Sequence, residues 1–175
     1  HASTWDINSV WNNDCRSIDE HMLRFMENHD EQRIASADFA GNPWLAVPGM
    51  IVSATMNVGP VMIYFGQEVG EPANRAEGFS SNDGRTTIFD YWGVPEHQKW
   101  LNHGKMDGGQ LTDDQKNLRA FYSKLLNLVR NNEALREGEF WELMIANERQ
   151  QGFDQRLYLF LRYTDKQRIL VITNF

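Results

Sequence analysis

The six residues Phe25–Asp30, FMENHD, place polar and charged side chains directly after an apolar segment. Glu27, Asn28, His29 and Asp30 supply two carboxylates, an amide and an imidazole with no spacer between them. Carboxylates and imidazoles are the groups most often used for acid–base chemistry and for binding polar substrates. The cluster is therefore the first candidate for a functional site.

Three interpretations of Asn28-His29-Asp30 are open from the residues alone. In the first, the cluster is a polar strand end where His29 and Asp30 pair and cap the next segment. In the second, His29 ligates a metal ion, but the sequence has no His-x-His or His-Glu-x-x-His pattern to supply further ligands. In the third, the cluster is a catalytic or substrate-binding group at the carboxyl end of a parallel strand, where βα folds build their active sites.

The composition limits the class of protein and of partner. With 175 residues, 41% hydrophobic and 12% aromatic, the chain is long and apolar enough for a globular core. Its net charge of −7 argues against a nucleic-acid or anionic-membrane partner, because phosphate binding needs a basic face. Its apolar runs are shorter than the roughly 18 residues that span a bilayer. The single cysteine, Cys15, excludes an intrachain disulfide.

The elements that must position the cluster follow a strand–helix–strand order. Residues 22–28, MLRFMEN, and 61–65, VMIYF, are short apolar segments of strand length. The apolar stretch 44–58 between them is too long for a strand, so we expect a buried helix that begins near Pro48. Because both strands are apolar on both faces, the pattern favours a parallel sheet covered by helices.

A long helix is predicted from Thr112 to about Asn131. Thr112 and Gln115 have the spacing of a capping box, in which each side chain bonds the other residue's backbone N–H. Helical periodicity predicts the buried face. Its expected residues are Leu118, Phe121, Tyr122, Leu125, Leu128 and Val129.

Antiparallel strands are predicted after residue 137. The segments 140–146, 156–163 and 168–175 have strand character, and the short connection 164–167 between the last two is typical of a hairpin. The chain thus passes from an α/β part to an antiparallel β part.

Four segments, in order, resemble the α-amylase family, glycoside hydrolase family 13. FMENHDEQRIAS resembles the family's fourth short motif, an apolar strand followed by Asn-His-Asp, and GPVMIYFGQEVGEP resembles its eighth barrel strand. Pro60 directly after Gly59, and Phe65 in a tyrosine position, are small departures. FYSKLLNLVRNNEALREGEF resembles the last barrel helix, and RLYLFLRY and RILVITNF are similar to the opening strands of the following β-sandwich. The matches cover roughly residues 20–175.

The resemblance implies an α/β fold class, namely the C-terminal part of a (β/α)8 TIM barrel followed by the first antiparallel strands of an all-β domain. Residues 1–137 would belong to the catalytic barrel and residues 138–175 to the β domain. Two strands cannot close an eight-stranded barrel, and a sandwich cut after three strands has bare edges. We therefore expect a C-terminal fragment of a larger enzyme, with self-association through apolar surfaces.

The resemblance also implies roles for the cluster. Asp30 would be the family's third catalytic carboxylate, which hydrogen-bonds hydroxyls of the cleaved ring in its distorted, positively charged form. Such bonds act catalytically only if they tighten in the transition state. His29 would donate to hydroxyls of the same ring, and Asn28 is expected to bind substrate beside it.

Further residues are expected around the sugar. Arg33 either steers Asp30 or touches sugar, or it forms a surface ion pair with Glu31 or Glu27. The segment DGRTTIFDYW occupies the place of a loop motif with an arginine and an aromatic residue. Its residues expected to line the cleft are Arg85, Tyr91 and Trp92.

The implied function is a retaining α-glucan-processing glycoside hydrolase, like an α-amylase or α-glucosidase, acting on oligo- or polysaccharides such as starch. The family's nucleophile and acid/base motifs lie upstream of the matched segment, and nothing in residues 1–24 resembles them. The chain alone is thus expected to be inactive. The alternative is a non-catalytic glucan-binding or interaction member of the same fold. No metal or cofactor is expected in this chain, calcium is possible in the whole enzyme, and a periplasmic or extracellular location is suspected.

Overall fold

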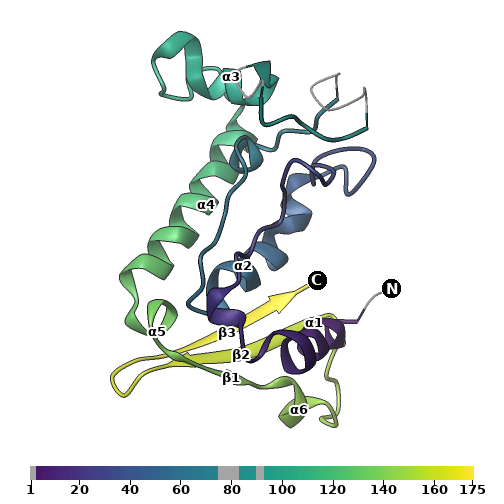
Figure 1. Ribbon diagram of the computed structural model, residues 1–175, viewed down its shortest axis with the longest axis vertical. Helices are drawn as coiled ribbons and strands as arrows, with labels where there is room; N and C mark the ends of the chain where they lie inside the picture. Colours follow the sequence, from purple (N-terminus) through teal and green to yellow (C-terminus); the bar gives the residue numbers. More distant parts are fainter. Residues whose placement is uncertain (1–2, 75–82, 90–92) are drawn as a thin grey trace. The chain divides into compact units, whose positions relative to one another are not determined.

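The computed structural model describes residues 3–74, 83–89 and 93–175 (Figure 1). The chain divides into two compact units, which are described separately. Unit 1 consists of His1–Arg24, Pro48–Val61 and Leu125–Phe175. Unit 2 consists of Phe25–Val47 and Met62–Lys124.

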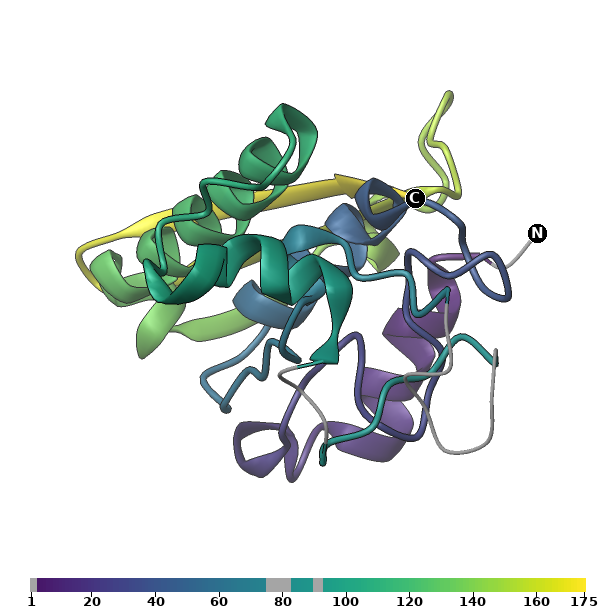
Figure 2. The ribbon, with the colours of Figure 1, turned by 90° about the horizontal axis from the view of Figure 1, so that it is seen from above.

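Unit 1 contains an antiparallel three-stranded sheet in the order β1-β2-β3. The connection between β2 and β3 is closed by Thr164, whose N–H donates to the Gln167 carbonyl at 2.8 Å. This connection and the C-terminus lie at opposite ends of the sheet (Figures 1 and 2). The hairpin and the last two predicted strands are confirmed, whereas the strand predicted over residues 140–146 ends at Glu142 and is followed by the helix Met144–Asn147. The strands are β1 (Glu139–Glu142), β2 (Leu157–Tyr163) and β3 (Arg168–Asn174).

The core of unit 1 lies on one face of this sheet. Alternation along β2 buries Tyr158 and Phe160 on that face, where they meet Val52 and Met56 from α2. Figure 1 shows α1 and α2 on the same side of the sheet. The predicted buried helix that begins near Pro48 is confirmed. The helices are α1 (Trp5–Val10), which continues as a π-helical turn (Trp11–Cys15), and α2 (Val47–Thr55).

The other face of the sheet is also apolar. Trp141, Leu170 and Ile172 are 59%, 54% and 55% exposed, respectively. Because strand side chains alternate between faces, these residues lie opposite the core residues of the same strands. The sheet therefore has two apolar faces, of which one is packed by helices within unit 1.

The two predicted parallel strands are wrong in extent. Within the described residues, the only pairing between these segments is one parallel bridge, between Arg24 and Val61. At Tyr64 a side chain replaces a neighbouring strand as the partner of the backbone, since the Tyr64 N–H donates to Gln67 Oε1 at 3.2 Å. The mixed helical and antiparallel architecture is thus present, while the barrel part of the fold class stays a prediction.

The long helix α4 (Asp113–Asn131) begins as the sequence predicts. The Gln115 N–H donates to Thr112 Oγ1 at 3.3 Å, and the Thr112 N–H donates to Gln115 Oε1 at 3.0 Å, which confirms the capping box. The predicted buried face does not continue into the last turns of α4, because Leu128 is 48% exposed. The fully buried positions of the predicted face are Leu118, Tyr122 and Leu125.

Short helices complete the two units. None of the helices in the described residues is long and apolar enough to cross a membrane. The α-helices are α3 (Pro95–Leu101), α5 (Glu133–Arg136) and α6 (Met144–Asn147). The 3-10 turns are Asp19–His21, Pro43–Ala46, Gln67–Val69 and Asn102–Gly104.

Gly59 allows two segments of unit 1 to approach closely. A Cβ atom at this position would lie 2.8 Å from the Met22 carbonyl oxygen and 3.0 Å from the Asp19 carbonyl oxygen. Asn57 holds the same approach from the side, since its Nδ2 donates to the Asp19 carbonyl at 2.6 Å. Backbone atoms cannot move aside cheaply, so this position requires glycine.

The Gly59→Ala variant should therefore be destabilised. We expect a loss of about 1–3 kcal/mol in the free energy of unfolding, the usual cost of overpacking. Gly93→Ala is the matched control, because a Cβ there meets no atom within 4 Å. Urea unfolding followed by circular dichroism measures both. Equal midpoints for the two variants would contradict the close approach.

Candidate functional site

The Asn28-His29-Asp30 cluster forms a tight turn in unit 2. Asn28 Oδ1 accepts hydrogen bonds from the backbone N–H groups of Asp30 at 2.8 Å and Glu31 at 2.9 Å. Such Asn turns fix the backbone two and three residues onward. Asn28 thereby holds the conformation of the turn, a structural contribution beside the substrate-binding role predicted for it.

His29 and Asp30 lie side by side on this turn. The distance between His29 Nε2 and Asp30 Oδ2 is 3.5 Å, and the two side chains are 42% and 70% exposed. An imidazole can donate one hydrogen bond while a carboxylate accepts several. The pair can therefore engage adjacent hydroxyl groups of one polyhydroxy ligand.

A buried ion pair lies directly next to this turn in the sequence. Arg33 Nη1 donates to Glu27 Oε2 at 2.8 Å, and the two side chains are 0% and 3% exposed. The second carboxylate oxygen, Glu27 Oε1, accepts from the Ile34 N–H at 2.7 Å. The expected alternative of an Arg33–Glu27 ion pair is thus present, but it is buried and not at the surface.

The other donors of Arg33 bond distant segments of unit 2. Nε donates to Thr86 Oγ1 at 2.9 Å, and Nη2 donates to the Phe65 carbonyl at 2.7 Å. The guanidinium carbon lies 4.3 Å from the centroid of the Tyr64 ring. The Arg33 N–H also donates to the Gly84 carbonyl at 2.6 Å. Hydrogen bonds from a charged guanidinium are short and directional. Through these bonds Arg33 connects its own segment with Phe65 and with residues 84–86.

Burial sets the electrostatics of this network. It raises the pKa of Glu27 above the ordinary value of 4.5, against the opposing effects of Arg33 and of the Ile34 N–H. A carboxyl with a raised folded-state pKa contributes stability below its unfolded pKa and loses it as pH rises through the folded value. Burial also raises the pKa of Tyr64, whose hydroxyl donates to the Thr86 carbonyl at 3.1 Å. For Glu27, the cost of leaving water thus exceeds the attraction to Arg33. The ion pair therefore fixes the positions of the two side chains more than it adds to the net stability of the fold.

Arg85 lies beside the turn. Its Nη1 is 3.5 Å from the Asp30 carbonyl oxygen, and its Nη2 donates to Asp83 Oδ2 at 2.6 Å. This ion pair holds the pKa of Asp83 below its usual value. The structure therefore brings Arg85 to the cluster, and its contact with sugar stays a prediction. Tyr91 and Trp92 lie outside the described residues.

The sequence offered Glu27 only as one of two possible surface partners of Arg33, so its burial was not predicted. A carboxylate directly after the apolar residues Phe25 and Met26 is costly to bury unless it is paired. That cost was the available signal, and Arg33, followed by the apolar residues Ile34 and Ala35, was the available partner. The acceptors from residues 65 and 86 carried no signal in the sequence.

Metal binding has no visible basis in the residues that the structure describes. Among them, no group of three or more His, Cys, Asp or Glu side chains lies close enough together to hold an ion. The cluster itself presents a carboxylate and an imidazole, both able to hydrogen-bond a ligand, on the Asn28 turn.

Comparison with known proteins identifies the fold. No family model and no curated protein matches the sequence. A solved cyclomaltodextrinase matches 91% of this chain with a TM-score of 0.56 and 23% identity, over 22% of its own length. An isomaltulose synthase variant from Erwinia rhapontici, in complex with D-glucose, matches 100% of the chain with a TM-score of 0.58 and 16% identity, over 38% of its length. The chain has the fold of the C-terminal part of these enzymes.

Two further solved structures share this fold. Trehalose-6-phosphate hydrolase from Bacillus licheniformis matches 97% of the chain at a TM-score of 0.53 and 19% identity, over 37% of its length. AmyP, solved in complex with maltose, matches 86% of the chain with a TM-score of 0.52 and 19% identity, over 30% of its own length. All four belong to the α-amylase family, which the sequence motifs also resemble. The chain spans between 22% and 38% of the lengths of these neighbours.

Removing the carboxylate of Glu27 should destabilise unit 2 strongly. In Glu27→Ala, the Arg33 guanidinium and the Ile34 N–H remain buried without an acceptor, which costs about 3–5 kcal/mol. Glu31→Ala is the control, because Glu31 is exposed and lies three residues after Asn28. It should change the free energy of unfolding by less than about 0.5 kcal/mol. Urea unfolding measures both variants.

A double variant tests whether the cost comes from the pair. Glu27→Ala combined with Arg33→Met removes the orphaned charge, so its loss of stability should be smaller than the sum of the two single losses. Additive losses would mean that the two side chains do not depend on each other.

Proposed function

We propose that this chain is part of a retaining α-glucan-processing glycoside hydrolase of the α-amylase type. The observation that carries the proposal is the exposed Asp30–His29 pair, 3.5 Å apart, on a turn that is flanked by the two residues of a buried ion pair, Glu27 before it and Arg33 after it. The fold shared with α-amylase-family enzymes supports it, as do the four sequence motifs that resemble this family.

Asp30 would act on the sugar ring that is being cleaved. Retaining glycosidases pass through an oxocarbenium-like transition state, in which the ring flattens and gains positive charge. The Asp30 carboxylate accepts hydrogen bonds from two ring hydroxyls, and these bonds strengthen as charge develops. His29 donates to a neighbouring hydroxyl of the same ring. Only the part of this binding that increases toward the transition state accelerates the reaction.

The nucleophile and the acid/base carboxylate would come from residues outside this chain. The two lie about 5 Å apart in retaining enzymes. In this chain, Glu27 is buried and paired with Arg33, and Asp83 is paired with Arg85, so neither is available for such a role. The chain spans at most 38% of the neighbours' lengths, which leaves most of such an enzyme to other residues. We infer that the chain alone binds sugar without cleaving it.

The substrate class follows from the neighbours and from the turn. AmyP was solved with maltose and the isomaltulose synthase variant with D-glucose, and both ligands are built of glucose units. The carboxylate and imidazole of the turn suit the adjacent hydroxyls of such rings. An α-glucan oligo- or polysaccharide is therefore the proposed substrate.

The proposal predicts weak, Asp30-dependent binding of maltotriose. Asp30→Asn should weaken binding about tenfold, because one charge-assisted hydrogen bond is lost. Asp38→Asn, also exposed and in unit 2, should leave affinity unchanged. Titration followed by amide shifts of residues 28–31 in 1H–15N spectra measures affinity at this turn alone.

Two outcomes would contradict the proposal. Unchanged affinity of Asp30→Asn at residues 28–31 would remove the sugar-binding role of the turn. Release of reducing sugar from soluble starch by the purified 175-residue chain would show that the chain holds its own nucleophile and acid/base.

A further inference from the structure

Unit 2 contains a cleft of about 310 Å³ between the end of α3, the loop that follows it and one face of α4. Its volume falls at the lower end of the range of about 300–1,000 Å³ for small-molecule sites. None of its lining residues belongs to the Asn28 turn or to the network of Glu27 and Arg33. They include Trp100, Asp107, Gly108, Leu111, Lys116 and Arg119.

Arg119 supplies accessible donors to this cleft. Its guanidinium carbon lies 5.0 Å from the centroid of the Trp100 ring, a contact that helps to hold the group in place. Among the residues that the structure describes, Nη1 and Nη2 have no hydrogen-bond partner and reach solvent, whereas Nε is buried. An arginine that packs against an aromatic ring keeps its outer N–H groups free for a ligand.

Lys116 brings a second cation to the same face of α4. It precedes Arg119 by three residues, and side chains at this spacing are neighbours on a helix. Its Nζ lies 3.5 Å from Asp113 Oδ1, and the two side chains are 53% and 97% exposed. Because exposed ion pairs of this kind contribute little, Lys116 can exchange Asp113 for a ligand.

The charges that line the cleft favour an anion. Lys116 and Arg119 stand against one carboxylate, Asp107, which leaves one positive charge in excess. The whole chain has a net charge of −7, but charges beyond about 8 Å are largely screened at physiological ionic strength. The local balance therefore decides the charge of a ligand.

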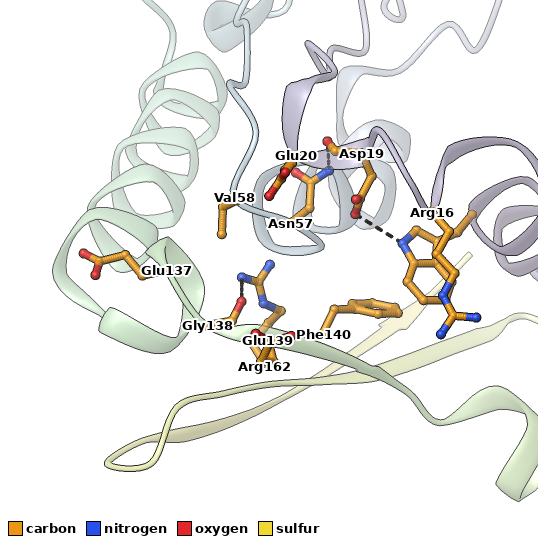
Figure 3. Close-up of a pocket in the computed structure, with 11 residues that line it drawn as sticks. Arg16, Asp19, Glu20, Asn57, Val58, Glu137, Gly138, Glu139, Phe140 and Arg162 are labelled. Carbon is orange, nitrogen blue, oxygen red and sulfur yellow. Dashed lines mark hydrogen bonds between the residues drawn. The ribbon is translucent and has the colours of Figure 1, made fainter.

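A cleft of unit 1 has the opposite balance and serves as an internal comparison (Figure 3). Its volume is similar, about 330 Å³, but its carboxylates outnumber its guanidinium groups. An anion would be repelled there. The charged residues that line it are Asp19, Glu20, Glu137 and Glu139 against Arg16 and Arg162.

Asp107 adds an acceptor to the cleft of unit 2. Its Oδ1 accepts from Asn102 Nδ2 at 2.7 Å and from the Gly109 N–H at 2.9 Å. These bonds hold the pKa of Asp107 below its usual value and partly balance its charge. Its Oδ2 has no hydrogen-bond partner among the described residues, so this oxygen is open to a hydroxyl group of a ligand.

The loop that carries Asp107 is fixed by its own backbone. The Gly108 N–H donates to the Trp100 carbonyl at 3.0 Å, and the Leu111 N–H donates to the Gly108 carbonyl at 3.0 Å. Gly108 has a φ of +68°, and a Cβ there would lie 3.1 Å from Leu111 Cδ1. The wall of the cleft is thus in place before a ligand arrives, which reduces the cost of binding.

We propose that this cleft binds one phosphate group, either free or as the monoester of a small hydroxylated molecule. A phosphate has enough oxygens for one to accept from the Nη groups of Arg119 while another accepts from Lys116. A hydroxyl of a monoester donates to Asp107 Oδ2. The assignment does not rest on the function proposed for the Asp30 turn, because it uses other residues.

Inorganic phosphate and glucose 6-phosphate are the probes that test the site. In 1H–15N spectra of the 175-residue chain, both should shift the Arg119 Nε–H signal and the Gly108 and Leu111 amides along one saturable curve. Glucose and acetate should not, and the Gly138 amide in the cleft of unit 1 should stay in place. Tighter binding of glucose 6-phosphate supports a monoester with a contact to Asp107, and equal affinities support the phosphate group alone.

Two pairs of variants examine the cations. Lys116→Ala should weaken phosphate binding about tenfold, the effect of one charge-assisted hydrogen bond, whereas Lys124→Ala should not. Arg119→Lys keeps the charge but removes one of the two Nη donors, so it should also weaken binding, unlike Arg130→Lys. Lys124 and Arg130 are exposed on α4 and do not line the cleft. Asp30→Asn should leave all these shifts unchanged, which separates this site from the Asn28 turn.

Three results would overturn the assignment. Absence of saturable shifts at about 10 mM of either phosphate probe, ten times a millimolar Kd, would mean that the cleft holds water only. Equal shifts with glucose or with acetate would mean a ligand recognised without its phosphate. Equal affinities of Lys116→Ala and Lys124→Ala would remove the second cation on which the site depends.

Discussion

The burial of Glu27 and Arg33 is the constraint on which unit 2 depends. Two charged groups with side-chain exposures of 3% and 0% have left water, and each of their hydrogen-bonding atoms then needs a partner inside the protein. Arg33 satisfies this need through Thr86 Oγ1 and the Phe65 carbonyl, which brings segments far apart in the sequence to one point. The pKa of Glu27 is raised despite its partner, so the pair organises the unit without adding much net stability.

This constraint reaches the exposed turn by covalent connection. Glu27 precedes Asn28 directly, and Asn28 fixes the N–H groups of Asp30 and Glu31. The buried carboxylate of Glu27 and the exposed carboxylate of Asp30 are therefore separated by only two residues. A binding group gains from such support, because its side chain need not be ordered when the ligand arrives.

The sequence predicted those elements that are determined by contacts between residues close together in the chain. The capping box of Thr112 and Gln115 fixes the start of α4 within four residues, and the β2–β3 hairpin joins strands that are adjacent in the chain. The parallel strands were wrong in extent because such pairing depends on neighbours that apolar character alone does not reveal. The sequence pointed to Asp30 and His29 through a motif, but the acceptors of Arg33 come from residues 65 and 86, and no local pattern announces them.

The hydrogen bonds of the Asn28 turn also bear on the charge of a ligand that the turn could accept. Because Asn28 Oδ1 takes the N–H groups of Asp30 and Glu31, these two backbone donors are not available to an anion. The outward surface of the turn carries the Asp30 carboxylate at 70% exposure, an electron-rich surface that repels phosphate and carboxylate groups. In the sugar-binding role proposed for the turn, this exposed carboxylate would therefore favour uncharged rings over anionic sugars.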